Sequence, residues 1–193
     1  MLEFSLKAMK RLKLKPDFFQ KAAPETARTL LGKFLVRRLP SGREIALMIT
    51  EVEAYDGFKD RGSHAHRGQT PRNTPMFGHP GRWYVYFTYG MHWLINVVTG
   101  KKGYPSAVLI RGGVATGKDG KTVKVSGPAR TAKFLKVTGK FSGLKADSKA
   151  SFWIEDRGIR IPAKKIRRGP RVGIEYAGEY WAARRWRFWT EAG

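Results

Sequence analysis

The sequence contains no cysteine, and this absence excludes disulfide bonds, thiolate nucleophiles and cysteine-based zinc sites. No apolar run reaches the roughly 18 residues that a membrane-spanning helix needs, and the first residues lack the apolar core of a signal peptide. The phosphate-binding patterns GxxxxGK[ST] and GxGxxG are also missing, which argues against nucleotide hydrolysis and dinucleotide cofactors. We therefore expect a cytoplasmic protein, close to the nucleoid if it is prokaryotic, that needs no cofactor and has no membrane partner.

Acidic residues are scarce: Asp and Glu number 15 against 38 Lys and Arg, so the formal net charge is +23. A small folded protein with this excess repels itself unless a polyanion neutralises part of the charge. Ten basic and only two acidic residues fall between Arg157 and Arg187. A single basic run is usually a solvated face, but this excess extends over the whole chain. We expect nucleic acid as the partner, bound through phosphate contacts that give affinity rather than specificity.

The length of 193 residues suits one domain with a substantial core. We predict a single α+β domain over residues 1–193, built on a curved antiparallel β-sheet with flanking helices and a protruding β-hairpin, and a basic N-terminal extension over residues 1–15. Strands are expected at 34–39, 44–55, 82–88, 91–98, 107–111, 152–155 and 185–189. Helices are expected near 24–31 and 129–137, and a Gly- and Lys-rich loop at 112–125. The polar segment 56–80 is long for a connection and is predicted to be functional.

Two features of the predicted strands suggest chemistry. Glu51, Glu53 and Tyr55 share one face at the end of a strand, where a carboxylate can serve as a general base or can simply face solvent. Tyr89 stands at the tip of the hairpin, where turns usually carry small residues. Its ring either folds back over the sheet or enters a DNA groove as a wedge. His64 and His66 are too few ligands to predict a metal site.

Taken in order, the motifs resemble the alkyladenine (3-methyladenine) DNA glycosylases from about Phe18 to Phe188. The matching segments are EVEAY (51–55), SHA (63–65), RGQTPRN (67–73), MF (76–77), PG (80–81), YVYFTYGM (84–91), Asn96, VLIR (108–111), SGP (126–128), RVG (171–173) and AGE (177–179). Motifs of this length at matching spacing are highly specific. The resemblance implies a monofunctional α+β enzyme that needs no metal, acts on damaged purines in double-stranded DNA and leaves an abasic site.

The resemblance also implies a role for individual residues. Glu53 matches the general base that activates water, and Arg111 the arginine near that water. The walls that hold the extruded base correspond to Tyr55, His64 and Tyr86, with Leu109 beside them. Asn96 matches the residue that rejects the 2-amino group of guanine, and Tyr89 the intercalating residue. Contacts to the DNA backbone are expected from Arg67, Thr70, Arg72 and Arg130.

The sequence departs from the family pattern after Arg111, where GGVATGK (112–118) replaces a Glu-Pro-containing stretch. Arg130 stands where a lysine is common. A lyase activity would need an amine nucleophile, and no lysine lies between Arg61 and Asn96. We therefore expect a monomeric glycosylase that excises alkylated, and also deaminated, purines such as hypoxanthine. The alternative is a non-catalytic protein that binds the DNA minor groove or RNA through the same basic surface.

Overall fold

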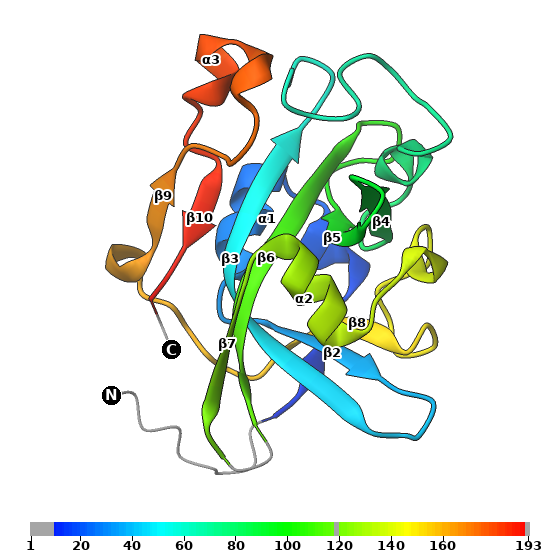
Figure 1. Ribbon diagram of the computed structural model, residues 1–193, viewed down its shortest axis with the longest axis vertical. Coiled ribbons are helices and arrows are strands. Elements are labelled where there is room, and N and C mark those ends of the chain that lie inside the picture. The colour runs from blue at the N-terminus through cyan, green and yellow to red at the C-terminus, as the bar shows by residue number, and fades with distance from the viewer. Residues whose placement is uncertain (1–9, 118–119, 192–193) are drawn as a thin grey trace.

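A computed structural model describes residues 10–117 and 120–191. The N-terminal extension expected at residues 1–15 falls largely outside these ranges. In the described part, three α-helices and ten strands form an α+β fold around one curled antiparallel sheet, which confirms the predicted fold class (Figure 1). The helices are α1 (Ala23–Leu30), α2 (Pro128–Leu135) and α3 (Glu179–Ala182). The strands are β1 (Leu12–Lys13), β2 (Phe34–Arg38), β3 (Glu44–Asp56), β4 (Trp83–Thr88), β5 (His92–Val98), β6 (Ser106–Thr116), β7 (Thr122–Ser126), β8 (Phe152–Asp156), β9 (Arg167–Gly169) and β10 (Arg187–Trp189).

The sheet runs in the order β1-β8-β2-β3-β6-β5-β4, and β3 is its central strand. Residues 44–48 of β3 pair with β2, whereas residues 51–53 pair with β10, which in turn carries β9. A β-bulge interrupts the pairing of β3 with β6 around Glu51. The C-terminal strand β10 therefore lies directly beside the part of β3 that carries the candidate carboxylates.

The two faces of the sheet bury different kinds of side chain. Alternate residues of β3 to β6, such as Val52, Ile110 and Val97, point into the main apolar core, which α1 covers. The intervening residues of the same strands point to the opposite face. Every strand residue that is proposed for catalysis or base binding lies on that face.

The predicted loop at 112–125 is wrong, because β6 continues to Thr116 and forms a hairpin with β7. The glycines that favoured a loop are needed for close packing. A Cβ atom at Gly113 would lie 2.3 Å from the Met48 carbonyl oxygen, and one at Gly112 would lie 2.9 Å from the Val125 carbonyl oxygen. Glycine here permits close approach of strand backbones rather than a turn.

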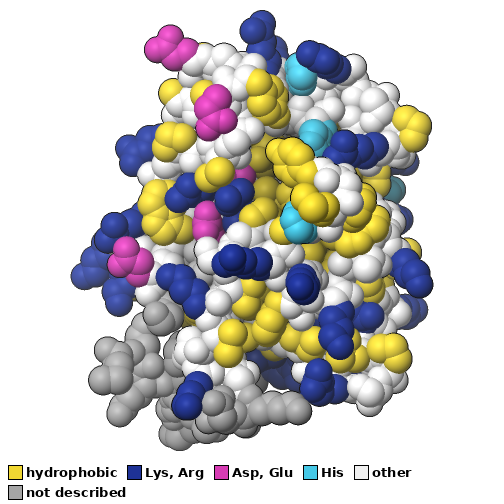
Figure 2. Space-filling model, in the orientation of Figure 1, with side chains coloured by type: hydrophobic (Ala, Val, Ile, Leu, Met, Phe, Trp, Pro, Cys, Tyr) yellow, Lys and Arg dark blue, Asp and Glu magenta, His cyan; other side chains and the backbone are white. Residues whose placement is uncertain are grey.

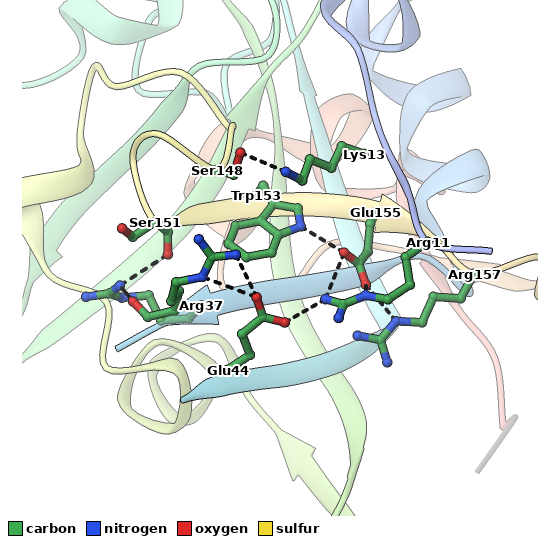
Figure 3. Close-up of polar contacts among 10 residues, drawn as sticks. Arg11, Lys13, Arg37, Glu44, Ser148, Ser151, Trp153, Glu155 and Arg157 are labelled. Carbon is green, nitrogen blue, oxygen red and sulfur yellow. Dashed lines mark hydrogen bonds and ion pairs between the residues drawn. The ribbon is translucent and has the colours of Figure 1, made fainter. Parts of the chain in front are cut away.

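A buried carboxylate holds the N-terminal strand β1 on the sheet (Figure 3). Glu155 is 1% exposed, and its oxygens accept hydrogen bonds from Arg11 Nε at 2.7 Å, Arg157 Nε at 2.7 Å and Trp153 Nε1 at 2.8 Å. Arg11 also binds Glu44 of β3 at 2.7 Å. These contacts satisfy the charge of Glu155 and connect β1, β8 and β3.

Candidate active site

A cavity of about 470 Å³ lies on the polar face of the sheet, between the strands and the segment 56–80. One register row crosses five strands beneath it: Tyr84 pairs with Asn96, Asn96 with Leu109, Leu109 with Glu53, and Glu53 with Arg187. Paired residues in adjacent strands share a face, about 5 Å apart. The sheet thus brings together residues that are distant in the sequence.

Most of the predicted site residues line this cavity. They are Tyr55, His64, Arg72, Tyr86, Tyr89, Asn96, Leu109 and Arg111. Glu53 lies directly behind Tyr55 and Arg111, whereas Arg67, Thr70 and Arg130 lie outside the lining.

Glu53 is fully buried, which excludes the reading of this residue as a solvent-facing strand carboxylate. Its Oε1 accepts a hydrogen bond from the Val172 backbone N–H at 2.8 Å. Its Oε2 accepts one from the Tyr55 hydroxyl at 2.9 Å and lies 3.4 Å from Arg111 Nη1. Burial raises the pKa of Glu53, although Arg111, the Val172 N–H, the Tyr55 hydroxyl and Arg171 oppose the shift. Three donors leave one carboxylate lone pair unused, and it can accept a proton or orient a water molecule.

Arg111 is shared between two carboxylates. Its Nε donates to Glu51 Oε1 at 3.0 Å while Nη1 approaches Glu53. Arg187 Nε lies 3.3 Å from the same Glu51 oxygen. Glu51 therefore helps to orient the Arg111 guanidinium toward Glu53, the candidate general base.

Aromatic rings form the walls of the cavity. Tyr86 stacks on Tyr84 with ring centroids 5.1 Å apart, and the His64 ring meets Tyr86 edge-on at 4.7 Å. His64 Nδ1 lies 3.0 Å from the Tyr84 hydroxyl oxygen. Burial of the imidazole by the surrounding protein, and then the positive charge of Arg72, lower the pKa of His64 to about 4, although the residue as a whole is exposed. Burial raises the pKa of Tyr55 well above its usual value, so the hydroxyl stays a donor to Glu53.

Asn96 is held rigidly at the cavity edge. Its Nδ2 donates to the Tyr84 backbone oxygen at 3.0 Å, and the residue is 4% exposed. An amide fixed in this way presents a constant shape to any planar ligand in the cavity.

Tyr89 protrudes from the hairpin tip. It is 87% exposed, so the ring does not fold back over the sheet. Tyr89 and Gly90 both have positive φ values, 53° and 65°, and Met91 N donates to the Thr88 oxygen at 3.1 Å. Positive φ at both central residues is typical of a type I′ turn, in which Asn-Gly is the favoured pair. A bulky residue in this conformation is strained, and such strain is concentrated at functional sites.

The four residues that are expected to contact the DNA backbone, Arg67, Thr70, Arg72 and Arg130, are all exposed. Arg72 is already engaged: its Nη2 donates to the Phe87 backbone oxygen at 2.9 Å, and its guanidinium lies 5.0 Å from the centre of the Tyr86 ring. Thr70 lies in a turn where Asn73 Oδ1 accepts from its N–H at 2.7 Å. Arg130 is in the first turn of α2. On the face drawn in Figure 2, Lys and Arg side chains surround patches of hydrophobic side chains, and Asp and Glu are few.

Sequence reasoning missed the support that the segment 171–176 gives to the site. Arg171 is completely buried and forms two bonds to Asp60, at 2.6 and 2.8 Å, and one to the Ala54 oxygen at 3.0 Å. This anchor positions the next residue, Val172, whose N–H binds Glu53. Tyr176, also in the cavity lining, donates to the Gly62 oxygen at 3.3 Å. The only signal in the sequence was the RVG motif, which carries no indication of its partner.

The described residues contain no group of three or more His, Cys, Asp or Glu side chains arranged to hold a metal ion. Likewise, no helix within these residues is both long and apolar enough to span a membrane. His66 contacts the Ser63 oxygen at 3.1 Å and takes no part in the cavity.

Comparison with known proteins identifies relatives over almost the whole chain. The sequence profile of the family Methylpurine-DNA glycosylase (MPG) matches residues 17–193. A protein of Methanocella arvoryzae is 44% identical over 91% of this chain and 90% of its own length. One of Streptomyces avermitilis is 42% identical over 94% and 89%, and one of Ehrlichia chaffeensis is 38% identical over 91% and 91%. Each carries the provisional name 3-methyladenine DNA glycosylase. The chain therefore belongs to the methylpurine-DNA glycosylase family.

Proposed function

We propose that this protein excises alkylated purines, 3-methyladenine foremost, from double-stranded DNA by hydrolysing the N-glycosidic bond and leaving an abasic site. The observation that carries the proposal is Glu53: a fully buried carboxylate with one free lone pair, placed in the same strand row as Leu109 and Asn96. A protein that only binds a polyanion has no use for a desolvated carboxylate beside its binding surface. This argues against the non-catalytic alternative.

The first step is extrusion of the damaged nucleotide, because a stacked base hides its glycosidic bond. Extrusion costs a few kcal/mol. Tyr89 fills the vacated stack, and the walls formed by Tyr55, His64 and Tyr86 hold the base. The cavity of about 470 Å³ is in the usual size range for small-molecule sites.

The chemical step breaks the bond between the sugar C1′ and the base nitrogen, and the bonding electrons leave with the base. A purine alkylated at N3 or N7 is cationic, so it leaves as a neutral molecule without a general acid. The sugar passes through an oxocarbenium-like state that the negative charge of Glu53 stabilises. Water adds to C1′ and transfers its proton to the carboxylate, and Arg111 keeps that carboxylate oriented.

Neutral lesions such as hypoxanthine need protonation as they leave. With a pKa of about 4, His64 is uncharged at neutral pH and is a poor acid for this step. We therefore propose that hypoxanthine is a substrate but is released more slowly than 3-methyladenine.

We propose a monofunctional enzyme that acts as a monomer in the cytoplasm without a cofactor. No lysine belongs to the cavity lining within the described residues, so a Schiff-base lyase step lacks its nucleophile.

The test is release of free 3-methyladenine, 7-methylguanine and hypoxanthine from defined duplexes, with abasic sites and strand breaks counted separately. We expect base release equal to the abasic sites formed, no strand breaks, and no release by a Glu53→Gln variant. Tight duplex binding without release of any base would refute the proposal and favour the non-catalytic alternative.

A further inference from the structure

Aromatic rings and guanidinium groups alternate from the cavity wall to the surface of α3. The Arg171 guanidinium lies 4.7 Å from the centre of the Tyr55 ring and 5.2 Å from that of Trp186. Trp186 is in turn 4.7 Å from the Arg184 guanidinium, which lies 5.4 Å from the Tyr180 ring. A continuous series of cation–π contacts therefore joins the base-binding wall to an exposed site (the end of the molecule near α3 in Figure 1).

The two arginines of this series differ in their polar partners. Arg171 is neutralised by Asp60. For Arg184, no side-chain hydrogen bond or ion pair is found within the described residues, and its buried Nε has no partner. Aromatic faces hold the Arg184 side chain in place without using its N–H donors. A guanidinium in this state carries a full charge and a rigid fork of donors that suits a phosphate group.

The surroundings of Arg184 are open. A hollow of about 500 Å³ is lined by Glu179, Tyr180, Ala183 and Arg184, and Tyr180 is 63% exposed. Arg185 follows in the chain and donates to the Arg168 backbone oxygen at 2.8 Å, which brings two more exposed arginines together. Within the lining of the hollow, Glu179 is the acidic residue and Arg184 is the basic one.

We propose that Arg184 binds a phosphodiester of the DNA outside the base cavity and is a DNA contact in addition to the residues named above. This inference rests on the proposed function, because it takes duplex DNA as the ligand. Since Trp186 lies between Arg171 and Arg184, a phosphate held there has a fixed position relative to Tyr55. The contact adds affinity without reading sequence.

The experiment measures binding of an undamaged duplex by fluorescence anisotropy between about 50 and 200 mM salt. The variants are Arg184→Gln and Arg184→Met, the second of which keeps an apolar chain between the rings if the first does not fold. Arg28→Gln is the matched control, because Arg28 is an exposed arginine of α1, which covers the opposite face of the sheet. Melting curves check that each variant is folded.

We expect either Arg184 variant to bind about tenfold more weakly at low salt, and the slope of log K against log salt to fall by about 1. The Arg28 control should keep the wild-type slope. A folded Arg184 variant with the affinity and slope of the Arg28 control would overturn the proposal. A loss of affinity with an unchanged slope would also overturn it, because that is the signature of a structural role. Undamaged DNA is used so that failure of base release, which bears on the proposed function, does not affect this measurement.

Discussion

Replacement of Tyr89 should change stability and activity in opposite directions. The backbone at Tyr89 is left-handed, with a φ of 53°, and the next residue is glycine. Asparagine tolerates this conformation far better than tyrosine does, and the strain of an ordinary side chain there is roughly 1 kcal/mol. Because the Tyr89 ring is 87% exposed, its removal costs few packing contacts. We expect Tyr89→Asn to raise the Tm by about 2–4 °C for a chain of this size.

The same substitution should slow base release. If Tyr89 occupies the space left by the extruded nucleotide, its stacking contributes about 1–3 kcal/mol to the flipped state. Each 1.4 kcal/mol corresponds to a factor of ten, so the single-turnover rate should fall by roughly tenfold or more. The loss should be smallest where the lesion is mispaired, because less pairing energy must then be overcome.

The assay compares wild type, Tyr89→Asn and Tyr89→Ser on well-paired and mispaired hypoxanthine under single-turnover conditions, with a melting curve for each. Serine lacks the preference of asparagine for the left-handed region, so Tyr89→Ser separates loss of the ring from relief of strain. A marked fall in Tm together with an equal loss on every substrate would refute the reasoning, because the ring would then act as part of the core.

Four other predictions concern the buried groups. Glu53→Gln should abolish base release and keep or raise DNA affinity, because it removes a negative charge near phosphate; a wild-type single-turnover rate would exclude water activation by Glu53. Because burial raises the pKa of Glu53, base release should be lost on acidification at a higher pH than an ordinary glutamate would give, as the carboxylate becomes protonated; a pH–rate profile that is flat down to the usual glutamate range would contradict this. Asn96→Ser should increase excision of undamaged guanine by enlarging the cavity beside the base, and guanine release no higher than wild type would count against the steric role. Asp60→Asn leaves the buried charge of Arg171 unpaired, at a cost of about 3–5 kcal/mol, and should lower the Tm by roughly 10 °C; a change of only a degree or two would show that the pair contributes little.

Local patterns were sufficient to predict the central strand β3 and the hairpin of β4 and β5, but not β1, β7 and β9. The alternation along 82–98 and 44–55 predicts β4, β5 and β3 closely, because side chains on opposite faces of a strand meet different surroundings. The same alternation places Glu53 and Tyr55 on one face, as the structure shows.

Contacts between distant residues could not be predicted in this way. Arg171 and Asp60 are 111 positions apart, and an arginine in a basic stretch is indistinguishable in sequence from its solvated neighbours. Gly112 and Gly113 favour a loop by composition, yet they lie in a strand because Met48 and Val125 leave no room for a Cβ atom. In both cases the deciding constraint comes from another part of the chain.

The position of β10 also has a consequence for synthesis of the protein. Glu53 lies in the first third of the chain. The register row that contains Glu53 ends at Arg187, and Val172, whose N–H donates to Glu53, is also close to the end of the chain. Chains emerge from the ribosome N-terminal end first and fold as their contacts become available. A nascent chain that already contains the hairpin and the aromatic walls has the Tyr55 hydroxyl but still lacks the Val172 N–H and the β10 residue that pairs with Glu53. The candidate active site is therefore completed only when β10 has been made.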